Sequence, residues 1–538
     1  MTEPRDHRTS VLIVGGGVSG LSTALFLARQ GIRSTLVERH PTESIMPKAR
    51  AFNPRTMEIY RGYGLEEEIR ERRSYLADFP EMIGADTLNG EERFRVDLAA
   101  HVESPAGVSP TDWAAIDQDE LERLLRVRAS EAGADIRFGT RMLSFDAGAD
   151  GVSAVVRELD GEAEYRIDAS YLVAADGHRA GIRETLGIGA DTLLPPVRGS
   201  YIVFEADLTE AVRDRRFILA YLDQPVPGTV LVPVGPGRWT TGFAYGPAIG
   251  ERPEDFTEER CAELTRQAIG LSDVDITLLP PVPGRPEKVA HSAAGGGAVV
   301  AHRFREGRVF LVGDAVHVVP PTGSYGASTG IADAHNLAWK LASVLKGHAG
   351  AGLLDSYEAE RRPVARITLD HAMNVLRART SGGAEGNQAL DDITMIFGYR
   401  YTSSAIHAED SSAATSVQDP RTATGEPGLR APHVWLEHNG NRFSTTELCT
   451  DSWSLLVGPD GEGWEEAAKT VAVDLGIDLR VYRIGAELRD PEQRFLAAYG
   501  LTATGASLIR PDGFVAWREP ARPDHGGLRQ ALTTLLAR

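Results

Sequence analysis

A glycine-rich turn near the N-terminus constrains the fold of this chain more than any other feature. Gly15, Gly17 and Gly20 form the pattern G-x-G-x-x-G between a β-branched run, Val11–Val14, and a segment with helical spacing, Leu21–Gln30. A tight turn and a close approach of backbone to a pyrophosphate both require residues without a Cβ, and the helix that follows offers free N–H groups to an anion. The pattern predicts a dinucleotide-binding βαβ unit with parallel strands.

A carboxylate completes this pattern. The apolar stretch Ser34–Val37 is the expected second strand, and it ends at Glu38, 18 residues after Gly20. A carboxylate at this place accepts hydrogen bonds from a ribose 2′-hydroxyl, so the site fits FAD or NAD and disfavours NADP.

The rest of the chain consists of segments with different residue patterns. We expect a helix over Gln118–Glu131, and short alternating segments such as Thr229–Val234 predict an antiparallel sheet between residues 197 and 300. Residues 381–432 are rich in Gly, Ser, Thr and Asp and are expected to be a linker. The tail has a strand–helix–strand pattern of its own, with strands at Trp453–Val457 and Leu479–Arg483.

Composition excludes several classes of function. The 76 acidic residues outnumber the 57 basic ones, and the net charge of −19 argues against a nucleic-acid partner. Two cysteines, Cys261 and Cys449, are too few for a disulfide framework and lack metal-ligand spacing, so no metal site is expected. The first ten residues are polar, and no run of about 18 apolar residues occurs. We expect a cytoplasmic protein without a membrane partner.

Two further acidic residues next to glycine decide between FAD and NAD. Asp176 and Gly177 follow an expected strand that ends at Ala175, and Asp314 follows the strand Arg308–Val312. An acid at a strand end can hold a ribityl hydroxyl while the adjoining helix N-terminus faces a phosphate. Either residue taken singly would usually form an Asx turn.

The three motifs in this order resemble those of the class A single-component FAD aromatic hydroxylases, the para-hydroxybenzoate hydroxylase type. More narrowly, the chain is similar to the actinobacterial aromatic-polyketide and antibiotic hydroxylases, such as the aklavinone hydroxylase type. The matching segments are LSTALFLARQG, NPRTME, GRVFLVGDAVH, PPTG and NLAWKL. The resemblance extends over nearly the whole chain.

The resemblance implies an α/β fold with three domains. A discontinuous Rossmann-like FAD-binding domain of the GR2 type would comprise residues 1–75, 105–190 and 300–380. A substrate-binding domain with the antiparallel sheet would comprise residues 76–104 and 191–299. A thioredoxin-like C-terminal domain, residues 433–538, would follow the linker. It has no C-x-x-C, so dithiol exchange is excluded and a structural or dimer-supporting role is expected.

The resemblance also implies which residues bind FAD. They are Gly15, Gly17, Gly20, Glu38, Arg39, Arg50, Gln118, Asp176, Gly177, Asp314, Pro321, Gly323 and Gly326. Arg50 resembles an arginine that contacts the pyrophosphate and lies on the approach of the pyridine nucleotide. Gln118 resembles a glutamine near the ribityl chain, and Asp314 would hold that chain. Pro321 to Gly326 would lie against the isoalloxazine ring.

One loop departs from the family pattern. Where members commonly have G-G-Q-G-x-N, this chain has Gly323-Ser324-Tyr325-Gly326-Ala327-Ser328. The glycines are partly kept, whereas the Gln and Asn are not. Tyr325 is either a substrate-facing ring or a packing residue.

The implied reaction is a hydroxylation of a phenolic secondary metabolite, a polyketide or a related antibiotic precursor. NADPH or NADH would reduce FAD, and O₂ would then give a flavin C4a-hydroperoxide. No second dinucleotide fingerprint is present, so the coenzyme is expected to dock transiently. Substrate contacts are expected from Tyr221, Phe243, Tyr245, His291 and Tyr325. No catalytic base is assigned, and a monomer or a homodimer is expected.

Two alternatives stay open at this point. A Baeyer–Villiger-type oxygenase on the same fold would share every motif. A flavoprotein that binds an antibiotic without turnover would also carry them.

Overall fold

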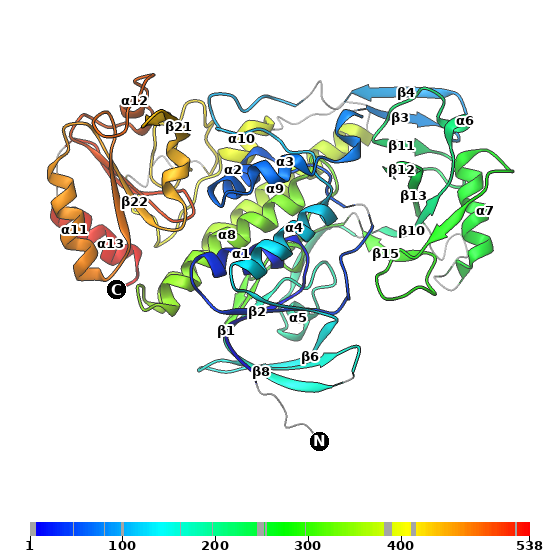
Figure 1. Ribbon diagram of the computed structural model, residues 1–538, viewed down its shortest axis with the longest axis horizontal. Coiled ribbons are helices and arrows are strands. Elements are labelled where there is room, and N and C mark those ends of the chain that lie inside the picture. The colour runs from blue at the N-terminus through cyan, green and yellow to red at the C-terminus, as the bar shows by residue number, and fades with distance from the viewer. Residues whose placement is uncertain are drawn as a thin grey trace.

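A computed structural model describes residues 7–46, 48–79, 81–97, 102–161, 163–195, 197–244, 252, 255–295, 297–380, 390–409, 416–521 and 525–538. A central part, built on a parallel sheet, lies between an antiparallel-sheet part and a C-terminal α/β part (Figure 1). Within these ranges, the structure contains no helix that is both long and apolar enough to span a membrane.

The central sheet contains the predicted βαβ unit. Its strands are β1 (His7–Val14), β2 (Ser34–Glu38), β5 (Asp135–Phe138), β6 (Thr140–Ala147), β7 (Val152–Glu158), β8 (Glu164–Ala174), β17 (Arg305–Glu306) and β18 (Val309–Leu311). Their order is β17-β18-β8-β1-β2-β5, with β7 beside β8 and β6 beside β7. Strand β1 pairs in parallel with β2 and β8, which places Val14 opposite Val37 and Ala174. The residues that follow β1, β2 and β8 therefore meet at one edge of the sheet.

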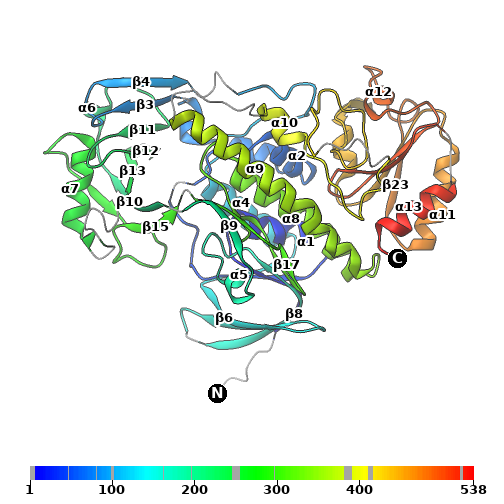
Figure 2. The same ribbon diagram turned by 180° about the vertical axis from the view of Figure 1, so that it is seen from behind.

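Helices cover this sheet and form most of the core with it. They are α1 (Val18–Arg29), α2 (Pro54–Gly62), α3 (Glu66–Glu71), α4 (Gln118–Glu131), α5 (Gly181–Thr185), α8 (Tyr325–Leu345) and α9 (Ser356–Thr380). Helix α1 packs between α4 and α8, and α9 runs alongside α8 (Figure 2). Asn53 caps α2 by accepting the Thr56 N–H at 2.9 Å, with Pro54 at the first helical position.

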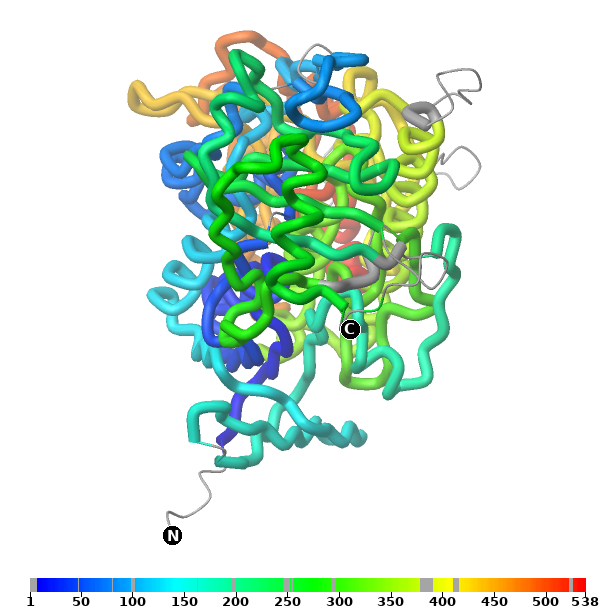
Figure 3. The backbone as a smooth tube through the Cα atoms, turned by 90° about the vertical axis from the view of Figure 1, so that its right-hand side faces the viewer, coloured from blue at the N-terminus to red at the C-terminus, as the bar shows by residue number. Residues whose placement is uncertain are grey.

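The second part, which faces the viewer in Figure 3, contains the expected antiparallel sheet. Its strands are β3 (Glu81–Ala85), β4 (Glu92–Asp97), β10 (Val197–Glu205), β11 (Leu219–Leu222), β12 (Thr229–Gly235), β13 (Arg238–Ala244), β14 (Thr277–Leu279) and β15 (His291–Gly295). Within this sheet, β3 and β11 pair in parallel. One face packs on α7 (Glu258–Ile269), with α6 (Thr209–Val212) nearby. Leu231 lies in that core, whereas Val230 and Val232 face the opposite way because side chains alternate along a strand. A small sheet of β9 (Ala190–Leu194), β16 (Ala298–Ala301) and β19 (His317–Val318) lies beside the central part.

The C-terminal part has the thioredoxin-like arrangement that the sequence predicts. Its elements are β20 (Trp435–His438), β21 (Asn441–Ser444), β22 (Trp453–Val457), α11 (Gly463–Leu475), β23 (Leu479–Arg483), α12 (Phe495–Tyr499), β24 (Ala506–Ile509), β25 (Val515–Glu519) and α13 (His525–Leu535). The sheet order is β23-β22-β24-β25, with β22 and β23 parallel and the other pairs antiparallel. Trp464 on α11 and Leu528 on α13 are buried in its core.

The segment expected to be a linker is packed where the structure describes it. Helix α10 (Asp392–Phe397) carries buried apolar residues, and Tyr401 stacks on Phe514 with ring centroids 4.1 Å apart. Much of the Gly-rich part of this segment, residues 381–389, lies outside the described residues. The exact domain boundaries stay a prediction.

Candidate functional site

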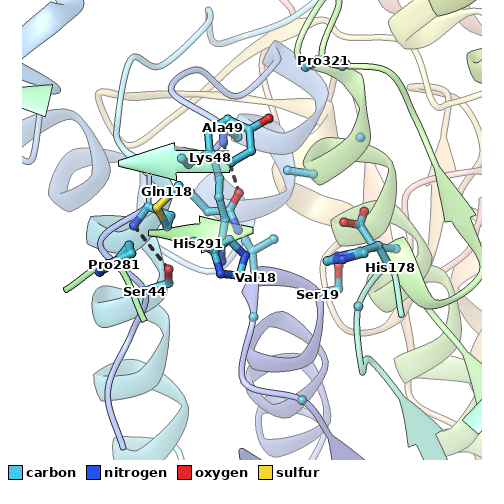
Figure 4. A pocket seen from close by; sticks show the side chains of 18 of the residues that line it. Val18, Ser19, Ser44, Lys48, Ala49, Gln118, His178, Pro281, His291 and Pro321 are labelled. Atoms are coloured by element: carbon cyan, nitrogen blue, oxygen red, sulfur yellow. Dashed lines mark hydrogen bonds between the residues drawn. The ribbon is translucent and has the colours of Figure 1, made fainter. Parts of the chain in front are cut away.

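A cavity of about 2790 Å³ lies at the edge of the central sheet where the parallel strands end, and it extends to the antiparallel sheet. The turn after β1, the end of β2, the start of α4, the loop after β8 and the loop before α8 all contribute to its lining. Figure 4 shows Lys48, Gln118 and His291 on one side of this space, with Ser19 and His178 on the other. The topology thus brings residues from distant parts of the chain to one site.

The three glycines of the turn have different structural requirements. A Cβ on Gly15, whose φ is +116°, would lie 2.1 Å from the Ala175 carbonyl oxygen, and one on Gly20 would lie 2.0 Å from the Gly15 oxygen. Gly17 lines the cavity, and its nearest neighbour would be Glu122 Oε1 at 3.8 Å. Packing therefore requires the first and third glycines, whereas the second leaves space for a ligand at the N-terminus of α1.

Glu38 is held against this turn. Its Oε2 accepts the Gly16 N–H at 2.7 Å, and its Oε1 accepts the His40 N–H at 2.8 Å. The carboxylate still lines the cavity, as does neighbouring Arg39. Burial and the positive charge of Arg179 lower the pKa of Arg39.

Gln118 and Arg50 lie on the same wall. Gln118 begins α4; its Oε1 accepts the Ala49 N–H at 3.2 Å, and its Nε2 donates to Glu122 Oε1 at 2.7 Å. Arg50 donates to the Pro233 carbonyl oxygen at 2.9 Å and so connects the central part to the antiparallel sheet. Burial lowers the pKa of the Arg50 guanidinium.

Asp176 provides an orphaned polar atom at the end of β8. Its Oδ2 accepts the Ile182 N–H at 3.0 Å, whereas its Oδ1 is buried and has no hydrogen-bond partner within the described part of the chain. Burial raises the pKa of this carboxyl. Gly177 follows with φ +77°, and Asp314 is exposed to the cavity from the loop after β18. The glycine turn lies at the N-terminus of α1, where the Val18 N–H donates to Glu122 Oε1 at 3.2 Å. This turn and the unsatisfied Asp176 oxygen are groups that a dinucleotide uses, so the residues present fit FAD.

The loop that departs from the family pattern forms another wall of the cavity. Pro321, Gly323 and Gly326 all line the cavity. Gly323 has φ +79°, and a Cβ there would lie 2.2 Å from the Tyr325 ring. Tyr325 both lines the cavity and packs against His371, with ring centroids 5.3 Å apart. The two interpretations of Tyr325 from the sequence are therefore compatible.

The candidate substrate residues differ in their position relative to the cavity. Tyr221, with 37% of its surface exposed, and His291 line the cavity. Burial, together with Arg179, lowers the pKa of His291 to about 4. Tyr245 lies outside the described residues.

Phe243 was expected to contact the substrate, but it lies on the other side of the sheet from the cavity. It packs against Phe256 in the core beneath α7, with ring centroids 5.8 Å apart, and does not line the cavity. The reason is strand alternation: Thr240 on the same strand faces the cavity, so Phe243, three residues later, faces the opposite side. The two-residue alternation of side chains along this strand could have identified Thr240 from the sequence as a residue that faces the cavity. Nothing in the sequence indicated Asp392, which also lines the cavity.

Comparison with known families decides the assignment. The model of the FAD binding domain family matches residues 8–372, and that of the aromatic-ring hydroxylase C-terminal domain matches residues 424–538. The chain belongs to the FAD-dependent aromatic-ring hydroxylases. This membership confirms the family resemblance, the cofactor FAD and the monooxygenase class inferred from the sequence.

Individual hydroxylases resemble this one over their full length. Tetracenomycin A2 monooxygenase-dioxygenase of Streptomyces glaucescens is 41% identical and covers 98% of this chain and 97% of its own. Aklavinone 12-hydroxylase of Streptomyces purpurascens is 42% identical, with 98% and 99% covered. The crystal structure of aklavinone-11 hydroxylase with FAD and aklavinone is 39% identical, has a TM-score of 0.87, and covers 99% of this chain and 100% of that one.

Proposed function

We propose that this hydroxylase introduces one oxygen atom into a phenolic ring of a polycyclic, polyketide-type molecule, with NADPH or NADH as reductant and O₂ as oxidant. The observation that carries this proposal is one continuous cavity that joins the dinucleotide turn to the face of the antiparallel sheet. A cavity of about 2790 Å³ offers room for FAD and for a substrate with several fused rings. Relatives named for aklavinone and tetracenomycin support the substrate class.

The residues at the edge of the central sheet are assigned to FAD. Gly17 and the N-terminus of α1 would bind the pyrophosphate, Glu38 the adenosine ribose and Asp314 the ribityl chain. The loop from Pro321 to Gly326 would support the isoalloxazine ring. Bound FAD supplies the electron-transfer and oxygen-transfer chemistry, and the chain supplies position, orientation and exclusion of water.

The residues on the antiparallel sheet are assigned to the substrate. Met82, Val230 and Val232 present an apolar surface to the cavity, and Tyr221 adds an aromatic ring. A flat aromatic molecule on this surface would displace water, which protects a reactive oxygen donor from unproductive decay.

Basic groups on the cavity wall are assigned to the transient coenzyme. Arg50 and Lys48 line the cavity from the segment between β2 and α2. They would attract the phosphates of a pyridine nucleotide in a protein whose net charge is −19.

Oxidation of the coenzyme tests the proposal. FAD-loaded protein is mixed with NADPH or NADH, with and without a panel of polycyclic phenols that begins with aklavinone, and H₂O₂ is measured in parallel. We expect one phenol to accelerate oxidation with little H₂O₂ and to gain a hydroxyl group. An NMR spectrum of the product distinguishes a new phenol from the lactone that a Baeyer–Villiger reaction would give. No acceleration and no product with any phenol or coenzyme would contradict the proposal.

A further inference from the structure

Three side chains from separate helices meet at the cavity wall beside the loop 321–326. They are Tyr325 at the start of α8, His371 on α9 and Asp392 at the start of α10. The Tyr325 hydroxyl donates a hydrogen bond to Asp392 Oδ1 and lies 3.1 Å from His371 Nε2. Since the Tyr325 hydroxyl has one proton and donates it in the hydrogen bond to Asp392, it accepts a hydrogen bond from His371. Tyr325 and Asp392 line the cavity, and His371 is buried behind them.

The backbone of the loop holds the Tyr325 ring in this place. Ser324 has φ +56°, a left-handed conformation that costs a residue with a side chain about 1–3 kcal/mol. The Thr322 hydroxyl donates to the Ala372 carbonyl oxygen at 2.9 Å, next to His371. A strained residue at a cavity wall, fixed by neighbouring contacts, is typical of a functional position.

The side chain of Asp392 has different contacts from that of its neighbour Asp391. Asp391 accepts a hydrogen bond from Arg421 at 2.7 Å and caps α10 through the Thr394 N–H at 2.9 Å. Asp392 forms no ion pair with the residues described, and its Oδ2 has no hydrogen-bond partner among them. Tyr325 belongs to a buried apolar cluster with Val108, Ala372 and Ile393. A half-buried carboxyl oxygen without a partner is available to a ligand in the cavity.

We propose that Asp392 is the catalytic residue that accepts the proton of the phenolic hydroxyl of the substrate, and that Tyr325 and His371 are positioning residues. The proposal rests on the function proposed above. The O–H bond of the substrate breaks, an O–H bond forms at Asp392 Oδ2, and the electron pair stays on the substrate oxygen. Carboxylates are weaker bases than phenolates, but a phenol becomes strongly acidic as its ring is attacked by an electrophilic oxygen. The proton is therefore transferred as the ring reacts, which is general base catalysis.

Asp392→Asn tests the role of the carboxylate, because an amide oxygen still accepts the Tyr325 hydrogen bond but takes up no proton. Asp391→Asn is the matched control, since it removes the same charge one residue earlier and Asn caps a helix as well as Asp does. The probe is aklavinone, or the panel phenol that the wild type hydroxylates fastest. We expect D392N to form product about 100-fold more slowly or worse, the lower end of the range for general base catalysis. The rate of FAD reduction and the KM should change by less than about threefold, and D391N should match the wild type.

The absorption spectrum of the bound phenol is a second readout that needs no turnover. A hydrogen bond to a charged acceptor shifts the phenol band to longer wavelength, so the shift should be present in the oxidised wild type and D391N and absent in D392N. Tyr325→Phe keeps the ring but releases Asp392. It should lower kcat about tenfold with KM unchanged and reduce the spectral shift, and it carries the test if D392N fails to fold.

The outcomes separate this inference from the proposed function. If the wild type hydroxylates the probe and D392N does so at the same rate and with the same spectrum, Asp392 is not the acceptor and the proposed function stands. If Y325F loses only thermal stability, with kcat and spectrum unchanged, the positioning role is wrong. If the wild type hydroxylates no phenol in the panel, the proposed function and this inference both fail.

Discussion

Arg510, in the turn after β24, donates hydrogen bonds to both carboxylate oxygens of Glu360 on α9, at 2.6 and 2.8 Å. Neither side chain is exposed, and Lys340 on α8 donates to the same carboxylate at 2.7 Å. Burial alone would raise the pKa of Glu360, but Arg510 and Lys340 hold it below its ordinary value. The thioredoxin-like part is thus attached to the long helices of the central part by buried, paired charges.

Substitution of Glu360 by Gln should destabilise the whole protein. The change leaves Arg510 and Lys340 as buried cations without a full counter-charge, which costs about 3–5 kcal/mol in comparable pairs. The measurement is the free energy of unfolding in urea. Asp370→Asn, which breaks an exposed pair with Arg366 on the same helix, is the control and should cost less than about 1 kcal/mol. Equal losses of unfolding free energy in the two variants would show that the buried ion pair contributes no more to stability than the exposed pair.

The glycine turn predicts different defects for two similar substitutions. Gly17→Ala places a Cβ no nearer than 3.8 Å to other atoms, at the N-cap of α1, so the apoprotein should lose about 1 kcal/mol or less. The Kd for FAD should rise about tenfold or more. Gly20→Ala places a Cβ 2.0 Å from the Gly15 oxygen and should destabilise the apoprotein itself by about 1–3 kcal/mol. FAD fluorescence titration and thermal unfolding of both apoproteins check this. Normal FAD affinity in G17A would show that the pyrophosphate does not lie at Gly17.

We expect His335 to cause part of the loss of folding stability in acid. Burial, together with the positive charge of Arg55, lowers the pKa of His335 to about 3 in the folded protein, where its ring lies against Phe26. Below pH 6.5 the unfolded chain therefore binds a proton that the folded protein does not, and stability falls as the pH falls. Between pH 7 and pH 5 this amounts to about 2 kcal/mol.

The test compares the wild type with His335→Phe, which keeps an aromatic ring without a titrating group. Urea unfolding at pH 7 and pH 5 should show a loss about 2 kcal/mol smaller in the variant. Other titrating groups contribute equally to both proteins and cancel. The same pH dependence in both would mean that His335 is already protonated when folded.

Tyr221 should contribute to substrate binding and little to stability. Its ring is 37% exposed and faces the cavity from β11. Tyr221→Ala should raise KM about tenfold through loss of apolar contact area, with thermal stability unchanged. Tyr221→Phe keeps the ring and should retain the wild-type KM. An unchanged KM in Y221A would place the substrate elsewhere in the cavity.

Local patterns in the sequence predicted much of the fold. The expected helix Gln118–Glu131 and the strands Trp453–Val457 and Leu479–Arg483 have the same bounds in the structure, because each is an uninterrupted periodic segment between clear breaks. Helix α10 was missed, since six residues in a polar stretch carry too little periodicity. Its burial depends on tertiary contacts that no local pattern contains.

The candidate site shows the same limit. Gly15 follows β1, Asp176 lies just after β8, and Glu38 ends β2. Because β2 and β8 both pair in parallel with β1, the topology alone brings these residues together. Asp392 and His371 meet Tyr325 only because α8, α9 and α10 converge, and the sequence separations of 46 and 67 residues give no sign of it. Phe243 was misplaced because its residue type was considered without its position in the alternating strand.

Transfer of an oxygen atom from O₂ to an aromatic ring by this chain can be followed with ¹⁸O₂. FAD-loaded protein, NADPH and the phenol that best accelerates coenzyme oxidation are incubated under ¹⁸O₂, and the product is analysed by mass spectrometry. We expect a product with one ¹⁸O atom, located by NMR as a new hydroxyl on a ring carbon. A product whose new oxygen carries no label, or H₂O₂ as the sole product of oxygen, would contradict oxygen transfer to the ring.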